Sequence, residues 1–541
     1  MYVVLGLRRY SVISLSILVG IFLVACNMSA EKKPELMPVD TTINKENAYI
    51  GAFLDSAYVA QFLQGAKLSK ADSAGFLSFY RDRNFQYAWF DSAGMTEQAY
   101  NFINLYTGYR QSMNDSVLYN AALDKAVEGW MEDSTQHKPE RDEIASMEML
   151  LSKQFFLYSE KAYGVNASID LPDLGWFIPK KKLDPKVFLD SVVLAGGRDI
   201  QQLAPVHPMF EQLRKALSAY TSIALKYKFD SIAFAAKKYT VGDSAADIGR
   251  IKERLHILGD LPAEDSGNVY TKATAKGVKQ FQQRMGIAAD GVAGKSFFAE
   301  LNTPIEIKIQ KILINMERAR WVPKPGHGAY IVVNIPDFKL RCYDSSHMQL
   351  ELPVVVGKPA SSTVIFNGNM KYVVFSPYWN LPYSIVKNEV KKNIFYYMKH
   401  RMQVVGRYSD GLPQLRQKPG PNNSLGRVKF LFPNSYNIYL HDTPSKSLFG
   451  ETKRAFSHGC IRVGTPEKLA AWVLKTYPEW TTEKIEEAMN LDDEKTVTLS
   501  KPIPVFIGYF TCWVDANGKV NFRNDIYGHD KKLAEHLFHA Q

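Results

Sequence analysis

Cysteine is scarce in this chain. Only 4 of the 541 residues are cysteines, too few for a fold built from disulfide bridges. Glycine and proline, with 34 and 26 residues, are not enriched, which excludes collagen-like and low-complexity chains. After the first 25 residues, no apolar run reaches the roughly 20 residues that a membrane-spanning helix requires. The composition is 46% hydrophobic and 22% charged, as in globular proteins, and the length predicts three or four domains.

Negative charge is the scarcer sign. Lysine and arginine together number 66, against 55 aspartates and glutamates, which gives a net charge of +11. Such an excess suits an anionic partner, so nucleic acid, an acidic membrane surface and an acidic cell-wall polymer are the candidates at this point.

The N-terminal segment indicates which of these anionic partners the protein meets. Arg8 and Arg9 precede an apolar run, Val12–Ala25, that is too short to span a membrane and is typical of a signal peptide. The run ends in Leu-Val-Ala before Cys26, which resembles a bacterial lipobox. We expect a signal peptide over 1–25, lipidation at Cys26 and a polar tether over 26–45. The protein is then exported to the periplasm and anchored by lipid to the outer membrane of a Gram-negative bacterium. Export excludes nucleic acid as a partner and limits membrane contact to the lipid anchor; an uncleaved signal anchor is the alternative.

Residues 46–240 predict a helical scaffold domain. Phe76, Phe79 and Tyr80 recur at helical spacing, and a second helical stretch runs over Glu140–Lys161. The region offers no candidate nucleophile, so we expect it to have a structural role.

The next unit, 241–302, combines two amphipathic helices with a glycine-rich turn. Phe281-Gln282 lies near the end of the second helix and is followed by Asp-Gly-Val-Ala-Gly over 290–294. Glycine is favoured in such turns because it adopts positive φ without strain. These residues resemble the small three-helix peptidoglycan-binding domain. The resemblance implies the glycan strands of peptidoglycan as a partner.

A linker helix is predicted over 303–327, and a mostly-β domain over 328–510. Its strands are indicated by β-branched and aromatic runs between turn residues: Tyr330–Ile335, Leu352–Gly357, Lys371–Phe375, Arg427–Phe432, Asn437–His441, Thr496–Leu499 and Val505–Tyr509. An insertion at about 380–427 is predicted to be a lid, because long insertions in compact domains are often functional. Its first half, Ile385–Met402, predicts a basic helix, and its second, Arg407–Gly426, an irregular loop. With a C-terminal tail over 511–541, the chain is a multidomain α+β protein.

One motif in the β domain can carry chemistry. Ser457-His458-Gly459-Cys460 precedes Arg462, and His441, at the end of an apolar stretch, is separated from Ser457 by 15 intervening residues. A thiol attacks as the thiolate, yet a free cysteine has a pKa of ~8.5 and is mostly protonated at neutral pH. An imidazole or guanidinium nearby can stabilise the anion, and a histidine can carry protons. Cys460 is therefore the candidate nucleophile.

The spacing from His441 to Ser457–Cys460 resembles the signature of the L,D-transpeptidase family, and Tyr439–Pro444 resembles its larger, lid-containing members. The resemblance implies a catalytic Cys460, His441 as base, and an oxyanion hole around His458, Gly459 and Cys460. Asp442 or a backbone carbonyl near it would orient His441. Four further residues are expected to contact substrate: Arg462, Ser457, Trp379 and Tyr439.

The same resemblance implies acyl transfer without a cofactor. Cys460 would release the terminal D-alanine of a tetrapeptide stem, hold the stem as a thioester and pass it to an amine, forming a 3→3 cross-link in the cell wall. Peptidoglycan stems and glycan strands are the expected partners, and carbapenems the expected inhibitors. The sequence leaves the oligomeric state open.

Several alternatives are compatible with the same residues. A cysteine hydrolase of wall peptides, such as an L,D-carboxypeptidase, would let water replace the amine. A wall-binding lipoprotein would need no catalysis. His441, His458 and Cys460 are chemically able to bind zinc, although we expect no metal. Cys342 and Cys512 are able to pair in an oxidising compartment, provided that the fold brings them together.

Overall fold

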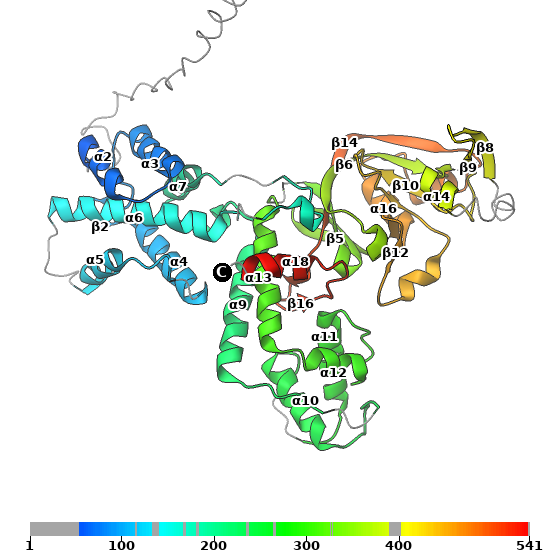
Figure 1. Cartoon of the computed structure of the whole chain (residues 1–541), viewed down its shortest axis with the longest axis horizontal. Helices are drawn as coiled ribbons and strands as arrows, with labels where there is room; N and C mark the ends of the chain where they lie inside the picture. Colours follow the sequence, from blue (N-terminus) through cyan, green and yellow to red (C-terminus); the bar gives the residue numbers. More distant parts are fainter. Residues whose placement is uncertain are drawn as a thin grey trace, which may run out of the picture. The chain divides into compact units, whose positions relative to one another are not determined.

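The computed structural model describes residues 53–113, 116–132, 140–165, 169–179, 183–233, 237–262, 267–324, 326, 328–388 and 402–538 (Figure 1). The predicted signal peptide, the lipidation site Cys26 and the tether lie outside these residues. Within the described part, no helix is both long enough and apolar enough to cross a membrane. The chain divides into two compact units, Met1–Gly94 and Met95–Gln541.

The first unit is a helical pair. Helix α2 (Ser56–Gly65) is capped by Asp55, and helix α3 (Lys70–Asp82) by Ser69, whose side chain accepts from the backbone N–H of Asp72. Phe76, Phe79 and Tyr80 are all buried, as their helical spacing predicted. Two short strands follow, β1 (Phe90–Asp91) and β2 (Gly94–Met95).

The second unit begins with helices, which confirms the predicted helical region. They are α4 (Glu97–Met113), α5 (Ala121–Glu132), α6 (Arg141–Tyr163), α7 (Pro185–Leu194), α8 (Ile200–Leu203) and α9 (Met209–Lys226). Aromatic rings fill the space between α4, α6 and α7. Phe102 and Phe188 each lie 5.0 Å from Phe155 between ring centroids.

Three helices form the next module: α10 (Ala246–Ile257), α11 (Lys272–Met285) and α12 (Lys295–Leu301). The Gln282 side chain links the two motifs of this unit, Phe281-Gln282 and Asp290-Gly291. Its Nε2 donates to Oδ1 of Asp290 over 2.8 Å, and its Oε1 accepts from the backbone N–H of Gly291 over 2.8 Å. Gly291 has φ of +74°, and a Cβ there would lie 3.0 Å from the carbonyl oxygen of Ala275. The glycine is therefore required by the close approach of the turn to α11.

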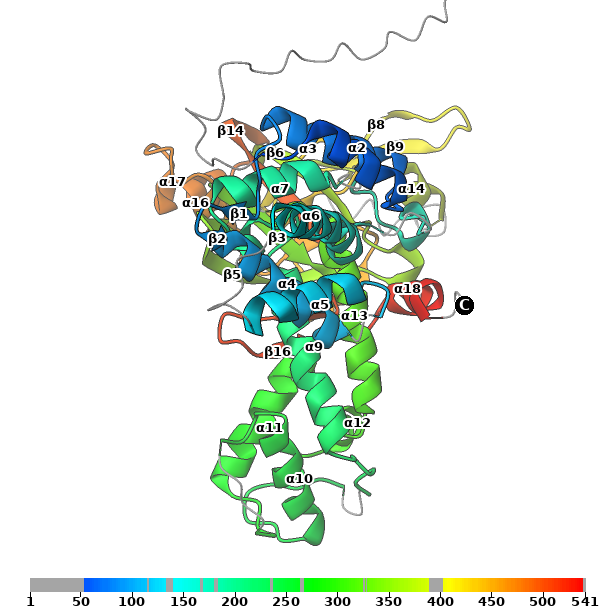
Figure 2. The same ribbon diagram turned by 90° about the vertical axis from the view of Figure 1, so that its left-hand side faces the viewer.

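Helix α13 (Ile305–Trp321) leads from this module to the β domain, and it runs beside α9 in every view (Figure 2).

A nine-stranded sheet follows, with the order β12-β5-β13-β11-β10-β6-β14-β3-β4. Its strands are β3 (Ala329–Asn334), β4 (Lys339–Asp344), β5 (His347–Gly357), β6 (Phe366–Phe375), β10 (Val428–Leu431), β11 (Leu440–His441), β12 (Ala455–Ser457), β13 (Ile461–Val463) and β14 (Lys495–Gly508). Helices α16 (Pro466–Val473) and α17 (Thr482–Ala488) connect β13 to β14.

The insertion is more ordered than its sequence suggests. Strands β7 (Trp379–Asn380), β8 (Met402–Arg407) and β9 (Pro413–Gln417) form a small sheet in the order β7-β9-β8, and helix α14 (Tyr383–Asn388) packs beside it. The irregular loop predicted over Arg407–Gly426 is therefore wrong in its first part. The remainder of the predicted basic helix, 389–401, lies outside the described residues.

A small hydrophobic cluster explains the order of the insertion. Leu381, Val386 and Leu415 are buried together, and Trp379 and Tyr408 pack against them. The loop after β9 is fixed by buried amides: Asn423 donates to the carbonyl oxygens of Pro377 and Lys418 over 2.9 and 3.0 Å.

The segment after the sheet folds back on α13. Strands β15 (Cys512–Val514) and β16 (Val520–Phe522) pair as a hairpin, and helix α18 (His529–Phe538) ends the described chain. Arg318 of α13 forms a buried ion pair with Asp530 at 2.6 Å, and Thr511 donates to the same carboxylate over 2.8 Å. Cys342 and Cys512 are both buried free thiols, so the two cysteines do not pair in this structure.

Candidate active site

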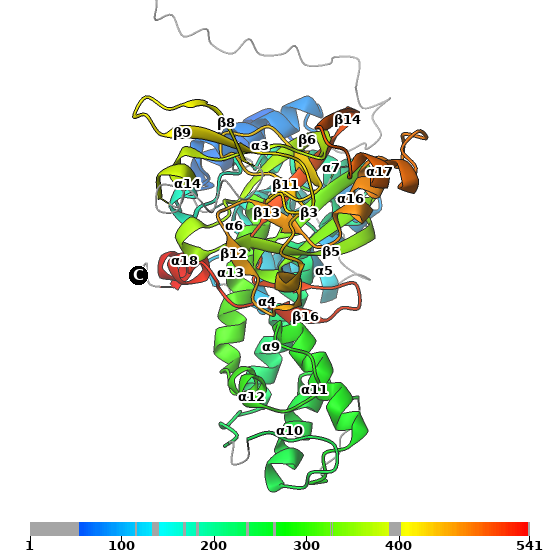
Figure 3. The same ribbon diagram turned by 90° about the vertical axis from the view of Figure 1, so that its right-hand side faces the viewer.

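Two adjacent parallel strands position the candidate catalytic residues. In the β11–β13 pair, Leu440 lies opposite Ile461 and His441 opposite Arg462 (Figure 3). Because side chains alternate between the faces of a strand, His441 and Arg462 project on one face, together with the residues two positions before them. Those are Tyr439 and Cys460. The structure thus gathers four of the predicted residues at one place.

The turn before β13 sets the orientation of Cys460. The Ser457 hydroxyl donates to the carbonyl oxygen of Cys460 over 2.5 Å and accepts from the backbone N–H of Gly459 over 3.1 Å. Gly459 has φ of +119°, a conformation that strains any residue with a Cβ. Ser457 is therefore buried within the turn and shapes it, rather than presenting its hydroxyl to substrate.

Two residues from distant parts of the chain support this turn. Thr363, on the loop before β6, donates its hydroxyl to the carbonyl oxygen of Gly459 over 2.7 Å and accepts from the backbone N–H of Gly357 over 2.9 Å. Tyr527 donates its hydroxyl to the carbonyl oxygen of Gly357 over 2.6 Å and accepts from the backbone N–H of Thr363. The peptide between Gly459 and Cys460 is held through this chain of bonds.

His441 is buried and oriented by a backbone carbonyl. Its Nδ1 lies 2.5 Å from the carbonyl oxygen of Asp442. Since a carbonyl oxygen only accepts hydrogen bonds, Nδ1 carries the hydrogen, and Nε2 keeps the lone pair that a base needs. The Asp442 carboxylate has other partners: the backbone N–H groups of Arg427 and Thr443, and the Lys446 ammonium at 2.6 Å.

Burial keeps His441 neutral. It lowers the pKa of the imidazole to about 4, and the neighbouring Arg462 guanidinium acts in the same direction. The carbonyl oxygen of Asp442, the charge of its carboxylate and the carbonyl oxygen of Leu425 all raise the pKa without cancelling this shift. At neutral pH the ring is therefore a free base able to take a proton.

Cys460 rests as a thiol. Its Sγ donates to the carbonyl oxygen of Asn437 at 3.5 Å, and the side chain is half-buried. Burial raises the pKa of the thiol, while hydrogen bonding from Tyr439 and the charge of Arg462 favour the thiolate without reversing the shift. Burial and its hydrogen bond to Cys460 in turn raise the pKa of the Tyr439 hydroxyl. The two pKa shifts favour a thiol and a neutral imidazole over a thiolate–imidazolium pair at neutral pH.

Arg462 places a positive charge in the site without a carboxylate partner among the described residues. Its Nε is buried and has no hydrogen-bond acceptor there. Burial lowers the pKa of the guanidinium, and the interaction that opposes this shift comes from Cys460. Because this half-buried guanidinium has no carboxylate partner among the described residues, it is available to an anionic group that enters the site.

Two predicted site residues differ from the four on the shared strand face. His458 lies in the turn before β13, and its side chain is exposed. Trp379 packs within the hydrophobic cluster of the insertion, which gives it a structural role there. In the described part of the chain, no group of three or more His, Cys, Asp or Glu side chains is arranged to hold a metal ion.

Sequence reasoning missed Thr363, Tyr527 and Asn437. Asn437 adopts φ of +56°, and its carbonyl oxygen accepts from the Cys460 thiol. An asparagine shortly before His441 is a detectable turn signal, since asparagine tolerates positive φ. Thr363 and Tyr527 carry no such local signal, because their roles arise from contacts over 96 and 164 positions.

Comparison with known families matches three parts of the chain. Residues 328–498 match the L,D-transpeptidase catalytic domain, 75–217 a scaffold domain, and 244–301 the family described as "Putative peptidoglycan binding domain". A Haemophilus influenzae protein named "Putative L,D-transpeptidase" is 30% identical over 243 residues, covering 41% of this chain and 49% of that protein. The chain thus spans about half the length of this curated relative.

Solved L,D-transpeptidase structures show more distant similarity. The enzyme from Mycobacterium smegmatis is 13% identical, with a TM-score of 0.20, over 34% of this chain and 60% of its own. That from Stackebrandtia nassauensis is 15% identical, with a TM-score of 0.21, over 51% of this chain and 98% of its own.

The sequence matches and the site agree on one class. Residues 328–498 match the L,D-transpeptidase catalytic domain, and Cys460, His441 and the Ser457–Cys460 turn lie within this match. The chain joins that domain to a scaffold domain and a peptidoglycan-binding domain. The match over 328–498 favours an enzyme over the alternative of a non-catalytic wall-binding lipoprotein.

Proposed function

We propose that this protein is an L,D-transpeptidase that forms 3→3 cross-links in peptidoglycan through a Cys460 thioester. The observation that supports this best is the arrangement on β11 and β13, where a half-buried thiol shares a strand face with a neutral His441 and an unpaired Arg462. The three groups supply a nucleophile, a base and a carboxylate anchor.

The first half-reaction forms the thioester. His441 Nε2 takes the proton of the Cys460 thiol as Sγ attacks the carbonyl carbon of the third residue of a tetrapeptide stem. Proton removal is coupled to attack, because burial disfavours a thiolate before substrate arrives. The tetrahedral intermediate collapses, the amide C–N bond breaks, and the imidazolium returns the proton to the leaving D-alanine.

The second half-reaction forms the cross-link. The side-chain amine of a neighbouring stem attacks the thioester and loses a proton to His441. The C–S bond then breaks, the new amide forms, and the proton returns to the Cys460 sulfur. Each cycle ends with a neutral thiol and a neutral imidazole, as in the resting structure.

The oxyanion that forms in each half-reaction needs hydrogen-bond donors. The backbone N–H of Gly459 is bonded to Ser457, whereas that of Cys460 has no acceptor in the described part of the chain. We assign the Cys460 N–H as one donor and the Tyr439 hydroxyl as a second, since Tyr439 already contacts Cys460. Arg462 would hold a stem carboxylate near the reacting carbonyl.

Muropeptide analysis tests this function. Wild-type protein and the Cys460→Ala variant are incubated with tetrapeptide-containing muropeptides, and products are resolved by mass spectrometry. New 3→3 dimers with the wild type alone support the proposal. Tripeptides without dimers would instead identify an L,D-carboxypeptidase, the alternative that uses the same thioester with water as acceptor.

Carbapenem acylation tests the nucleophile separately. The strained β-lactam carbonyl should be attacked by Cys460, so the intact mass should rise by one inhibitor mass. An equal adduct on the Cys460→Ala variant would assign the nucleophile elsewhere.

We further propose that the protein acts in the periplasm, with residues 1–25 as a signal peptide and a lipid on Cys26. Peptidoglycan-binding and transpeptidase domains support a location at the cell wall. Mass spectrometry of the N-terminal peptide tests the anchor, because a Cys26→Ser variant should lose the lipid. An unmodified Cys26 in the wild type contradicts it.

A further inference from the structure

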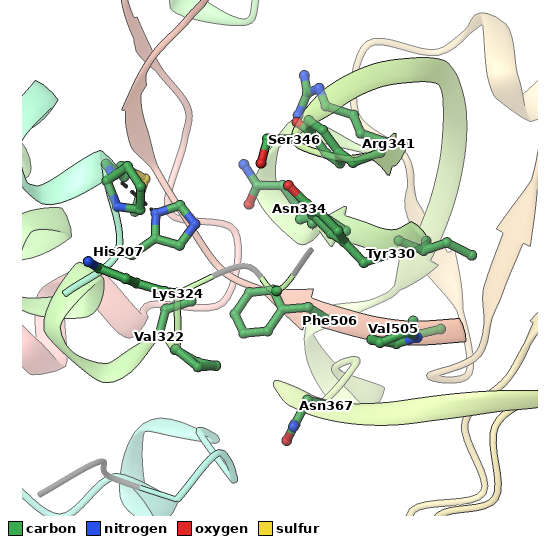
Figure 4. Close-up of a pocket in the computed structure, with 18 of the residues that line it drawn as sticks. His207, Val322, Lys324, Tyr330, Asn334, Arg341, Ser346, Asn367, Val505 and Phe506 are labelled. Carbon is green, nitrogen blue, oxygen red and sulfur yellow. Dashed lines mark hydrogen bonds between the residues drawn. The ribbon is translucent and has the colours of Figure 1, made fainter. Parts of the chain in front are cut away.

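A cavity of about 520 Å³ lies against strands β6, β14, β3 and β4, away from the β11–β13 site (Figure 4). The strand register builds its floor. Asn367 of β6 lies opposite Phe506 of β14, which lies opposite Val332 of β3, and Val332 lies opposite Arg341 of β4. These four residues form one row across four strands on a single face of the sheet.

Aromatic side chains make up much of the floor. Tyr330 stacks on Tyr343 with ring centroids 4.9 Å apart and an interplanar angle of 9°, and Phe506 stacks on Phe510 at 6.2 Å. Figure 4 shows His207, Val322 and Lys324 on the opposite side, facing the sheet. The cavity has the size of a small-molecule site and offers flat aromatic surfaces to a ligand.

The charges around the cavity exclude an ionic ligand. No aspartate or glutamate is among the described residues that line it. Arg341 is already paired with Asp337 at 2.6 Å and with Glu351 at 2.8 Å. Lys324 donates to the carbonyl oxygen of Gln202. An anion would therefore compete with existing partners, and a cation would find none.

Exposed amides supply the polar contacts. Asn367 and Asn369 project beside the aromatic floor, and Gln212 lies on the helical side. None of these three side chains has a hydrogen-bond partner within the described part of the chain. Asn334 differs, because its amide is bonded to the backbone N–H and carbonyl of Phe510. The three amides offer both donors and acceptors to a ligand, and a purely apolar ligand would leave them unpaired.

We propose that this cavity binds a short, uncharged oligosaccharide. One face of a pyranose ring carries C–H groups that pack on aromatic rings such as Phe506 and Tyr330, while its hydroxyl and acetamido groups bond to amides such as Asn367 and Asn369. The chemical class of the ligand, an uncharged oligosaccharide, follows from the residues of the cavity. That this oligosaccharide is the glycan strand of peptidoglycan rests on the proposed function. The cavity would then hold the strand while its stems react at Cys460.

Isothermal titration with N-acetylchitotetraose, an uncharged probe, tests the site in the full chain carrying Cys460→Ala. An Asn367→Ala/Asn369→Ala double variant removes both amides, and Val332→Trp fills the cavity from its floor. An Asn517→Ala variant is the matched control, because Asn517 is exposed at the tip of the β15–β16 hairpin and does not line the cavity. Circular dichroism checks that each variant is folded.

The double variant should weaken binding about tenfold, and Val332→Trp should abolish it, while Asn517→Ala binds as the parent does. Equal affinity in all variants would place binding elsewhere, for example in the α10–α12 module, and overturn the proposal. Absence of binding at 10 mM probe would overturn it as well. Because Cys460 is absent from every protein in this assay, the result does not depend on transpeptidase activity.

Discussion

Thr363 donates its hydroxyl hydrogen to the carbonyl oxygen of Gly459 over 2.7 Å. That carbonyl belongs to the peptide whose N–H is Cys460, so the bond fixes the direction in which the proposed oxyanion donor points. A donor held in advance of reaction stabilises the transition state without reorganisation.

Replacing Thr363 with valine should therefore slow turnover more than it weakens substrate binding. We expect kcat to fall by about 10–100-fold with KM nearly unchanged, since loss of one oxyanion donor costs about 10²–10³-fold and here the donor is only misaligned. Thr363→Ser keeps the hydroxyl and should retain most activity. Steady-state kinetics of both variants test this, and equal rates for valine and serine would contradict it.

The reactivity of Cys460 should rise with pH well beyond neutrality. Burial raises the pKa of this thiol, so the thiolate fraction at pH 7 is below that of a free cysteine and grows as pH increases. Iodoacetamide labelling of Cys460, followed by mass spectrometry from pH 6 to 10, should accelerate without a plateau near neutrality. Arg462→Met should shift the curve to still higher pH. A plateau below pH 7 would instead indicate a thiolate–imidazolium pair.

His441 should act as a base down to unusually low pH. Its pKa of about 4 predicts that the acid limb of the kcat/KM profile lies near pH 4, because protonation below that value removes the lone pair. His441→Ala should reduce turnover by about 10²–10⁴-fold. Asp442→Asn preserves the orienting carbonyl but removes a negative charge that raises the pKa of His441, so turnover should persist while the acid limb moves to lower pH. A loss of turnover in Asp442→Asn as large as that in His441→Ala would assign the orienting role to the carboxylate.

Gly426 should not tolerate a side chain. It has φ of +63°, and a Cβ there would lie 2.3 Å from the Asp442 carboxylate, which holds the loop beside His441. Gly426→Ala should destabilise the protein by about 1–3 kcal/mol, seen as a lower Tm in thermal unfolding. Gly450→Ala is the control, because its Cβ would meet no atom within 4 Å. Equal Tm values for the two variants would show that the loop relaxes around the methyl group.

The insertion should govern capture of donor stems only while its hydrophobic cluster is intact. Leu415→Asp places a charge in that cluster and should raise the apparent KM, while Cys460 remains open to alkylation. Val404→Asp is the control, since Val404 is 64% exposed on the neighbouring strand β8. Wild-type KM in Leu415→Asp would mean that the insertion takes no part in binding.

The helices and strands that depend on a local pattern of residues were predictable from the sequence. The β-branched and aromatic run Tyr330–Ile335 and the helical spacing of Phe76, Phe79 and Tyr80 are patterns of buried residues that a short segment is long enough to show. The motif around Cys460 also predicted the candidate nucleophile, which the structure places beside His441 and Arg462. The structure of the insertion was harder to predict from the sequence. Pro413 and the surrounding turn residues indicate a loop, but the buried contacts of Leu415 stabilise strand β9 there.

The protonation states of Cys460 and His441 cannot be predicted from the sequence. Whether Cys460 rests as thiol or thiolate depends on how deeply it and His441 are buried, and burial is set by strands paired across the whole domain. The sequence predicts that either the Asp442 carboxylate or a nearby backbone carbonyl orients His441. The distance from His441 Nδ1 to the carbonyl oxygen of Asp442 in the structure identifies the carbonyl.

The hairpin β15–β16 has a consequence for the order of events during folding. Arg284 of α11 donates to the carbonyl oxygen of Val520 over 2.6 Å, and Arg523 donates back to that of Arg284 over 2.9 Å, contacts that join residues 236 and 239 positions apart. The α10–α12 module therefore finds this docking partner only after the entire catalytic sheet has been synthesised. Closing so long a loop is slow, so we expect module docking to be a late kinetic step that follows formation of the sheet.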